Sequence, residues 1–108
     1  MQTDRLNQLL AFFRADSSDP FIIYGIGLEY VKLKQYSPAL EQFELLLKNH
    51  PDYLATHYQY GKLLEALNRK EDAVIIYQRG VLIANNQLNT HAKAELHQAI
   101  NEAQELDD

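Results

Sequence analysis

Apolar and small residues recur along the chain at steps of three and four, which is the spacing of one face of an α-helix. A first segment with this spacing contains Ile23, Ile26, Gly27, Tyr30 and Leu33. A second helix is predicted to follow, because Ser37 is a suitable N-cap and Pro38 suits a first helical position. It should end before Pro51, since the residue that precedes a proline avoids the helical conformation. Its apolar face consists of Ala39, Leu40, Phe43, Leu46 and Leu47.

The same pattern returns after 34 residues. This shift pairs identical residues: Tyr24 with Tyr58, Gly27 with Gly61, Leu33 with Leu67, and Ala39 with Ala73. The helical faces of the second copy contain His57, Tyr60, Gly61, Leu64 and Leu67, and then Ala73, Val74, Tyr77, Gly80 and Val81. Matches fall on small or apolar positions while polar positions differ, so the copies share a packing scheme rather than a surface. The sequence therefore predicts two helix hairpins, residues 20–53 and 54–87.

Stacked repeats need flanking elements that cover their apolar ends. Residues 3–15 are predicted to form one such helix, with Thr3 as its N-cap and the apolar residues Leu6, Leu9, Leu10, Phe12 and Phe13. Leu9, Phe12 and Phe13 lie 34 positions before Phe43, Leu46 and Leu47, so this segment corresponds to the second helix of an earlier repeat. The turn from Ser17 to Pro20 separates it from the next helix.

Residues 89–106 are predicted to form a C-terminal capping helix, with Asn89 or Thr90 as its N-cap. A narrow apolar stripe on an otherwise polar helix indicates that one side packs and the other is solvated. The stripe consists of Ala92, Leu96, Ala99, Ile100, Ala103 and Leu106. The chain is thus expected to be a single domain, residues 1–108, with about six helices.

The two hairpins resemble tetratricopeptide repeats, as found in small stand-alone bacterial proteins of that family. The residues that carry the resemblance in the first hairpin are Ile23, Ile26, Gly27, Tyr30, Ala39, Phe43, Leu46 and Pro51. In the second they are His57, Tyr60, Gly61, Leu64, Ala73, Tyr77, Gly80 and Asn85, where His57 and Asn85 depart from the family pattern, as does Leu46 in the first. The resemblance implies an all-α fold, a right-handed superhelix of antiparallel helix hairpins (an α-solenoid).

The resemblance also suggests why glycines stand inside the predicted helices. A glycine in a helix interior costs about 1 kcal/mol relative to alanine. In the family, the positions of Gly27 and Gly61 lie where the two helices of a repeat approach most closely, and those of Ala39 and Ala73 are expected to face them. Gly25 has no counterpart, since residue 59 is glutamine, and the sequence assigns it no role.

Positions that line the concave groove of such repeats are the candidate binding residues. The resemblance places there Phe21, Tyr24, Leu28, Val31, Lys32, Ala55, Tyr58, Lys62 and Glu65. An alternative is that Tyr24 and Tyr58 are packed beneath a flanking helix. Some members of the family bind a terminal carboxylate through a lysine and asparagines. Here the matching positions are Tyr24, Leu28 and Gln59, so no carboxylate clamp is expected.

Composition narrows the remaining possibilities. The chain has no cysteine, which excludes disulfides and thiolate chemistry. Its net charge is −5 and its ten Lys and Arg residues are scattered, which argues against nucleic acid or an anionic membrane as the main partner. The N-terminal apolar segment is short and closely flanked by charges, unlike a signal peptide or a membrane span, so a cytoplasmic protein is expected.

No motif for catalysis, phosphate binding or cofactor binding is present in the sequence. His91 and Glu95 share a helix face, but two potential ligands do not make a metal site. We therefore expect a non-catalytic interaction module without metal or cofactor, which binds a peptide or protein segment in the concave groove. The alternative is a structural subunit that forms weak homo-oligomers through the groove or its apolar ends.

Overall fold

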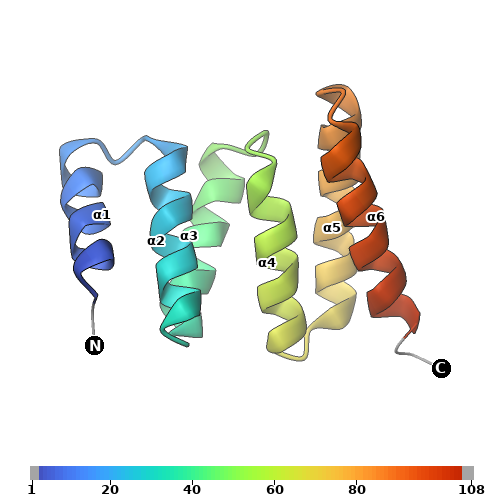
Figure 1. Cartoon of the computed structure of the whole chain (residues 1–108), viewed down its shortest axis with the longest axis horizontal. Helices are drawn as coiled ribbons and strands as arrows, with labels where there is room; N and C mark the ends of the chain where they lie inside the picture. The colour runs from blue at the N-terminus through green and yellow to red at the C-terminus, as the bar shows by residue number, and fades with distance from the viewer. Residues whose placement is uncertain (1–2, 106–108) are drawn as a thin grey trace. The chain divides into compact units, whose positions relative to one another are not determined.

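A computed structural model describes residues 3–105 of the chain, which form six α-helices and no strand (Figure 1). The helices are α1 (Asp4–Ala15), α2 (Pro20–Lys32), α3 (Tyr36–Asn49), α4 (Ala55–Ala66), α5 (Lys70–Asn86) and α6 (Thr90–Glu105). The predicted all-α fold is confirmed, while Leu106 of the predicted last helix lies outside the described residues. The chain divides between Thr56 and His57 into two compact units.

Side chains cap three helices, two of them as predicted. The predicted cap Thr3 accepts a hydrogen bond from the Leu6 amide at 3.0 Å, and Asp19, which was not predicted as a cap, accepts one from the Phe21 amide at 2.9 Å. Asn89, one of the two candidates for the last helix, accepts one from the Ala92 amide at 3.0 Å. Each cap satisfies an amide that has no partner within its helix.

The prediction that Ser37 caps the third helix is wrong. Helix α3 begins earlier, at Tyr36, with Gln35 in the cap position and no capping hydrogen bond from its side chain. The Gln35 carbonyl instead accepts from the Ala39 amide at 3.2 Å. Pro38 then lies within the first turn, where its missing N–H leaves no helical hydrogen bond unmade.

The 34-residue repeat is visible in the backbone. Lys34 and Asn68 both adopt the left-handed conformation, with φ values of 60° and 62°, directly after α2 and α4. In each turn the next amide bonds back to a helix carbonyl, from Gln35 to Tyr30 and from Arg69 to Leu64. This is a Schellman motif, which terminates a helix and reverses the chain. The turn that follows α5 uses the same conformation at Leu88, with φ 57°.

In the first unit, α2 packs against both α1 and α3. Leu6 and Leu9 of α1 are buried against Ile26 of α2. This packing gives Gly25 a role, because a methyl group there would lie 3.3 Å from the Leu9 side chain. Phe12 differs from the other predicted apolar residues of this helix, because it is 58% exposed, and the buried residues of α1 are Leu6 and Leu9.

Aromatic rings occupy the space opposite the two repeated glycines. A Cβ atom on Gly27 would lie 2.7 Å from the Phe43 ring, and one on Gly61 would lie 2.1 Å from the Tyr77 ring. Ala39 and Ala73, which are expected to face these glycines, are fully buried, but the group nearest to each glycine is the ring. The glycines therefore make room for an aromatic ring of the second helix.

In the second unit, α5 packs against α6. Gly80 of α5 lies close to both neighbouring helices, since a Cβ there would lie 2.8 Å from Cβ of His57 on α4 and 2.9 Å from Leu96 on α6. Figure 1 shows α5 between these two helices. His57 is 1% exposed, as predicted for its core position. The buried residues of α6 are Leu96, Ala99, Ile100 and Ala103.

Candidate functional site

In the first unit, the candidate binding residues lie along α2. The ring of Tyr24 is partly buried and rests on two aromatic rings, Phe43 at 6.5 Å and Tyr53 at 5.7 Å between centroids. Phe21, one turn before it, is 62% exposed. Leu28 and Val31 are partly buried and Lys32 is exposed. Tyr24 thus packs against an aromatic cluster and stays partly accessible.

Tyr53 contributes to this cluster from the segment that follows α3. Its pKa is raised above the ordinary value by burial and, to a smaller extent, by the carboxylate of Asp19. The hydroxyl therefore stays protonated at physiological pH and can donate a hydrogen bond. Ala55, the remaining candidate of this unit, is exposed at the start of α4.

In the second unit, Tyr58 repeats the arrangement of Tyr24. Its ring lies 6.3 Å from that of Tyr77 on α5, and both pairs are tilted, by 43° here and by 50° for Tyr24 and Phe43. The Lys62 ammonium lies over the Tyr58 ring, 5.4 Å from its centroid, and 3.7 Å from the Glu65 carboxylate. A cation held over a tyrosine face is attracted by the ring's quadrupole.

Glu65 is fixed from two sides. It accepts a hydrogen bond from the Tyr77 hydroxyl and pairs with Lys62, and its side chain is 22% exposed. The pKa of Tyr77 is raised far above its ordinary value, mainly by burial and further by this hydrogen bond to Glu65. Tyr77 therefore acts as a permanent donor that orients the carboxylate.

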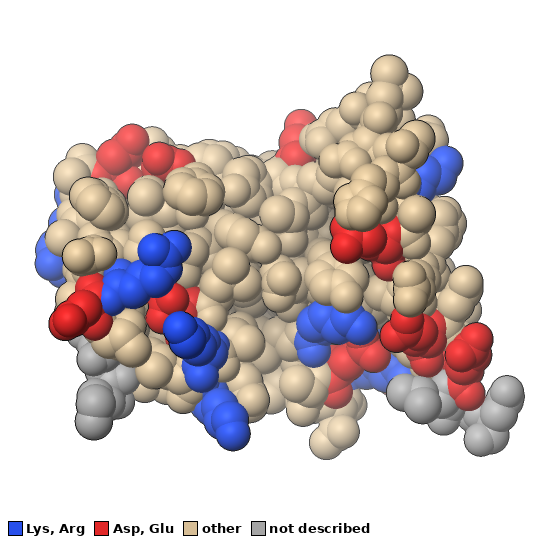
Figure 2. All heavy atoms as spheres, in the orientation of Figure 1, with Lys and Arg blue, Asp and Glu red and all other residues tan. Residues whose placement is uncertain are grey.

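Helix α6 also contributes to this surface, although the residues predicted for the second unit all lie on α4. A cavity of about 90 Å³ is lined by Tyr58 and Lys62 of α4 together with residues of α6. Those residues are Glu95, Gln98, Ala99 and Glu102. Their spacing of three and four places them on one helix face. This spacing is the feature of the sequence from which their shared surface could have been predicted. Figure 2 shows acidic side chains gathered over α6 on this face.

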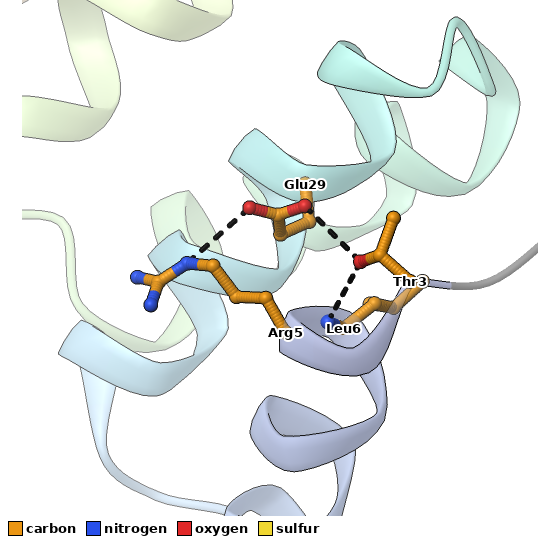
Figure 3. Close-up of polar contacts among 4 residues, drawn as sticks. All are labelled: Thr3, Arg5, Leu6 and Glu29. Carbon is orange, nitrogen blue, oxygen red and sulfur yellow. Dashed lines mark hydrogen bonds and ion pairs between the residues drawn. The ribbon is translucent and has the colours of Figure 1, made fainter.

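A separate polar cluster joins α1 to α2 (Figure 3). Glu29 of α2 has a side chain only 8% exposed and lies 3.3 Å from the guanidinium of Arg5. The hydroxyl of Thr3 donates to the same carboxylate at 3.4 Å, while its oxygen also caps α1 by accepting from Leu6. The cluster thus fixes the start of α1 on α2.

Potential metal ligands do not form a cluster of three or more in the part of the chain that the structure describes. His91 and Glu95 lie 3.5 Å apart, but within residues 3–105 no third potential ligand joins them. None of the six described helices is long and apolar enough to cross a membrane.

Comparison with known proteins gives the family. No family profile matches the chain, and neither does any curated protein. Among solved structures, the solution structure of a tetratricopeptide repeat domain protein from Salinibacter ruber is 37% identical, with a TM-score of 0.81. The match covers 84% of this chain and 92% of that one. The chain belongs to the tetratricopeptide repeat family.

One further structure supports the family and another shows the same fold. A crystal structure of a tetratricopeptide repeat domain protein from Salinibacter ruber is 38% identical to this repeat protein, with a TM-score of 0.78 and coverage of 82% and 98%. A protein from Bordetella parapertussis, 20% identical over 99% of this chain and 92% of its own, shares the fold with a TM-score of 0.83. Membership of this family supports, in general terms, a protein–protein interaction module.

Proposed function

We propose that this tetratricopeptide repeat protein binds a peptide, or a segment of a protein partner, through the first helices of its repeats. In this family those helices line the concave groove. The candidate residues are Phe21, Tyr24, Leu28, Val31, Lys32 and Ala55 in the first unit, and Tyr58, Lys62 and Glu65 in the second.

One observation carries the proposal. Tyr24 and Tyr58 stand at equivalent positions, and each ring is partly accessible and supported by the aromatic residue of the following helix, at 6.5 Å and 6.3 Å. A ring held in this way loses little conformational entropy when it contacts a ligand. Aromatic side chains with this preorganisation commonly contribute most to binding at protein interfaces.

The proposal is tested by capture of partners from the source cell with the wild-type chain and with Tyr24→Ala/Tyr58→Ala. A partner that uses this surface should bind the double variant at least about 30-fold more weakly, or about 2 kcal/mol. Ile75→Ala is the matched control, because Ile75 is also an accessible apolar residue, 47% exposed, but lies on α5. A partner that binds the double variant with unchanged affinity contradicts the proposal, and melting curves establish that both variants are folded.

Self-association is the second candidate function, and exposed leucines favour it. Leu82 and Leu88 near the end of α5 are 67% and 87% exposed. If this end mediates assembly, the mass measured by light scattering will rise between micromolar and millimolar concentrations. Leu82→Glu/Leu88→Glu will then restore the mass of a single chain. A mass that stays at that of one chain over the whole range excludes this function.

A further inference from the structure

We propose that the surface between α4 and α6 selects a partner segment that carries an arginine side chain. This inference rests on the proposed function and names the chemistry of the segment that the second unit binds. The site consists of Tyr58, Lys62 and Glu65 of α4 and Glu95, Gln98, Ala99 and Glu102 of α6.

The charge of this surface is the first argument. One lysine stands against three glutamates, which leaves two negative charges when His91 is uncharged. Among these glutamates and within the described residues, Glu65 alone is paired with an ammonium group, that of Lys62 at 3.7 Å. Glu102 accepts a hydrogen bond from the neutral amide of Gln98 at 2.8 Å, and Glu95 lies 3.5 Å from the exposed imidazole of His91. Glu95 and Glu102 therefore keep most of their charge available to a ligand.

The placement of Lys62 is the second argument. Its ammonium group already lies over the Tyr58 ring and beside a carboxylate, so the chain itself shows that a cation is held here. The side chain of Lys62 is 38% exposed and flexible enough to move aside. A ligand cation could then replace it on the ring face.

The shape of the cavity distinguishes arginine from a simple positive charge. The cavity is narrow, about 90 Å³, with the Tyr58 ring and the small residue Ala99 among its walls. A guanidinium is planar, stacks on aromatic faces and donates hydrogen bonds to carboxylates in a fixed geometry. An arginine stem can therefore lie across Ala99 while its head lies between the ring and Glu102.

The test begins with random 12-residue peptides displayed on phage and selected on the full chain. The best peptide is then synthesised in its arginine form and in forms in which each arginine is replaced by citrulline, an uncharged isostere of arginine. Calorimetry should show about tenfold weaker binding of the citrulline form, since citrulline loses both the cation–π contact and the charge pair.

Three variants identify the groups that select the peptide. Glu95→Gln/Glu102→Gln should weaken the arginine peptide several-fold, whereas Glu41→Gln/Glu44→Gln should not. The second pair removes the same charge from exposed positions of α3, so it controls for long-range attraction. Lys62→Gln should strengthen binding of the arginine peptide, because it removes the competing cation and changes only a partly exposed side chain.

The outcomes separate this inference from the proposed function. The arginine preference is overturned if the selected peptides need Tyr58 but carry no excess of arginine. It is also overturned if their citrulline forms bind equally well. Both outcomes leave groove binding intact. A selection that yields no peptide, or only peptides that bind Tyr24→Ala/Tyr58→Ala as well as wild type, overturns both.

Discussion

At the scale of single residues, the glycines of α2 and α4 differ in how much space their neighbours leave. The missing Cβ of Gly61 would lie 2.1 Å from the Tyr77 ring, far inside van der Waals contact. The ring is fully buried and its hydroxyl donates a hydrogen bond to Glu65, so rotating it away would lose packing contacts and this hydrogen bond. Gly25 is different, because its nearest neighbour is the end of the Leu9 side chain at 3.3 Å.

These distances predict opposite effects of the same substitution. Gly61→Ala should lower the free energy of unfolding by roughly 1–3 kcal/mol, because overpacking exceeds the gain in helix propensity. Gly25→Ala should be neutral or stabilising by up to about 1 kcal/mol, since Leu9 needs to shift by only tenths of an ångström. Urea denaturation of both variants measures the difference. Equal stability of Gly61→Ala and wild type would show that the Tyr77 ring repacks without cost.

Leu88 is a second residue whose local geometry predicts a stability change. It adopts φ 57°, a conformation that costs an L-residue about 1–2 kcal/mol, and its side chain is 87% exposed. Leu88→Gly should therefore raise the free energy of unfolding by about 1 kcal/mol. Leu88→Ala is the control, because it removes the side chain but keeps the strained backbone, and it should have little effect. Equal effects of the two variants in urea denaturation would contradict the strain argument.

At the scale of helices, the cluster around Glu29 determines how α1 docks on α2. A nearly buried carboxylate must be compensated, and here Arg5 and Thr3 provide the compensation from α1. Because the Arg5 side chain is itself 64% exposed, solvent screens the ion pair and limits its energy.

A double-mutant cycle measures this contribution. Arg5→Ala should lower the free energy of unfolding by about 1–2 kcal/mol, because Glu29 is left with one weak partner. In the background of Glu29→Gln the same change should have a much smaller effect, which gives a coupling energy of about 1 kcal/mol. The coupling should decrease in high salt. A coupling near zero at low salt would mean that α1 is held by its apolar contacts, chiefly those of Leu6 and Leu9.

Much of the helix arrangement was predictable because its determinants are local. The predicted caps Thr3 and Asn89 bond to amides three residues away in the sequence, and the 34-residue shift predicted the hairpins. Ser37 failed as a cap because the turn at Lys34 and Gln35 set the start of α3 instead. The turn depends on the end of the preceding helix, which a capping rule for single residues does not consider.

Contacts between helices were less predictable. Sequence gave the right positions for Gly27 and Gly61 but not the rings that face them, since spacing along one helix does not say which residue of the next helix meets it. Gly25 became interpretable only when Leu9 was placed beside it. For the same reason, the predicted surface contained Tyr58 and Lys62 but not Glu95 or Glu102, which approach them from 33 or more residues away.

At the scale of the whole molecule, charge should influence which end of a peptide can bind. The chain carries 15 acidic and 10 basic residues, a net charge of −5. At physiological ionic strength this charge acts over about 8 Å, so it disfavours an additional carboxylate near the surface. Local contacts add to this effect, because Tyr24 is committed to Phe43 and Tyr53 and offers no positive charge.

Amidation of a bound peptide tests this directly. A peptide selected on the chain should bind with equal or higher affinity when its C-terminal carboxylate is converted to an amide, because no lysine–asparagine clamp replaces the water around that carboxylate. Tyr24, Leu28 and Gln59 occupy the clamp positions, and each lacks either the charge or the short amide that such a clamp needs. Calorimetry of the acid and amide forms at low and physiological salt measures the difference, and any advantage of the amide should shrink as salt rises. A peptide that loses tenfold or more in affinity on amidation would show that carboxylate recognition has been built from other residues. Lys32 and Lys62, the two lysines among the candidate residues, would then be the first positions to substitute.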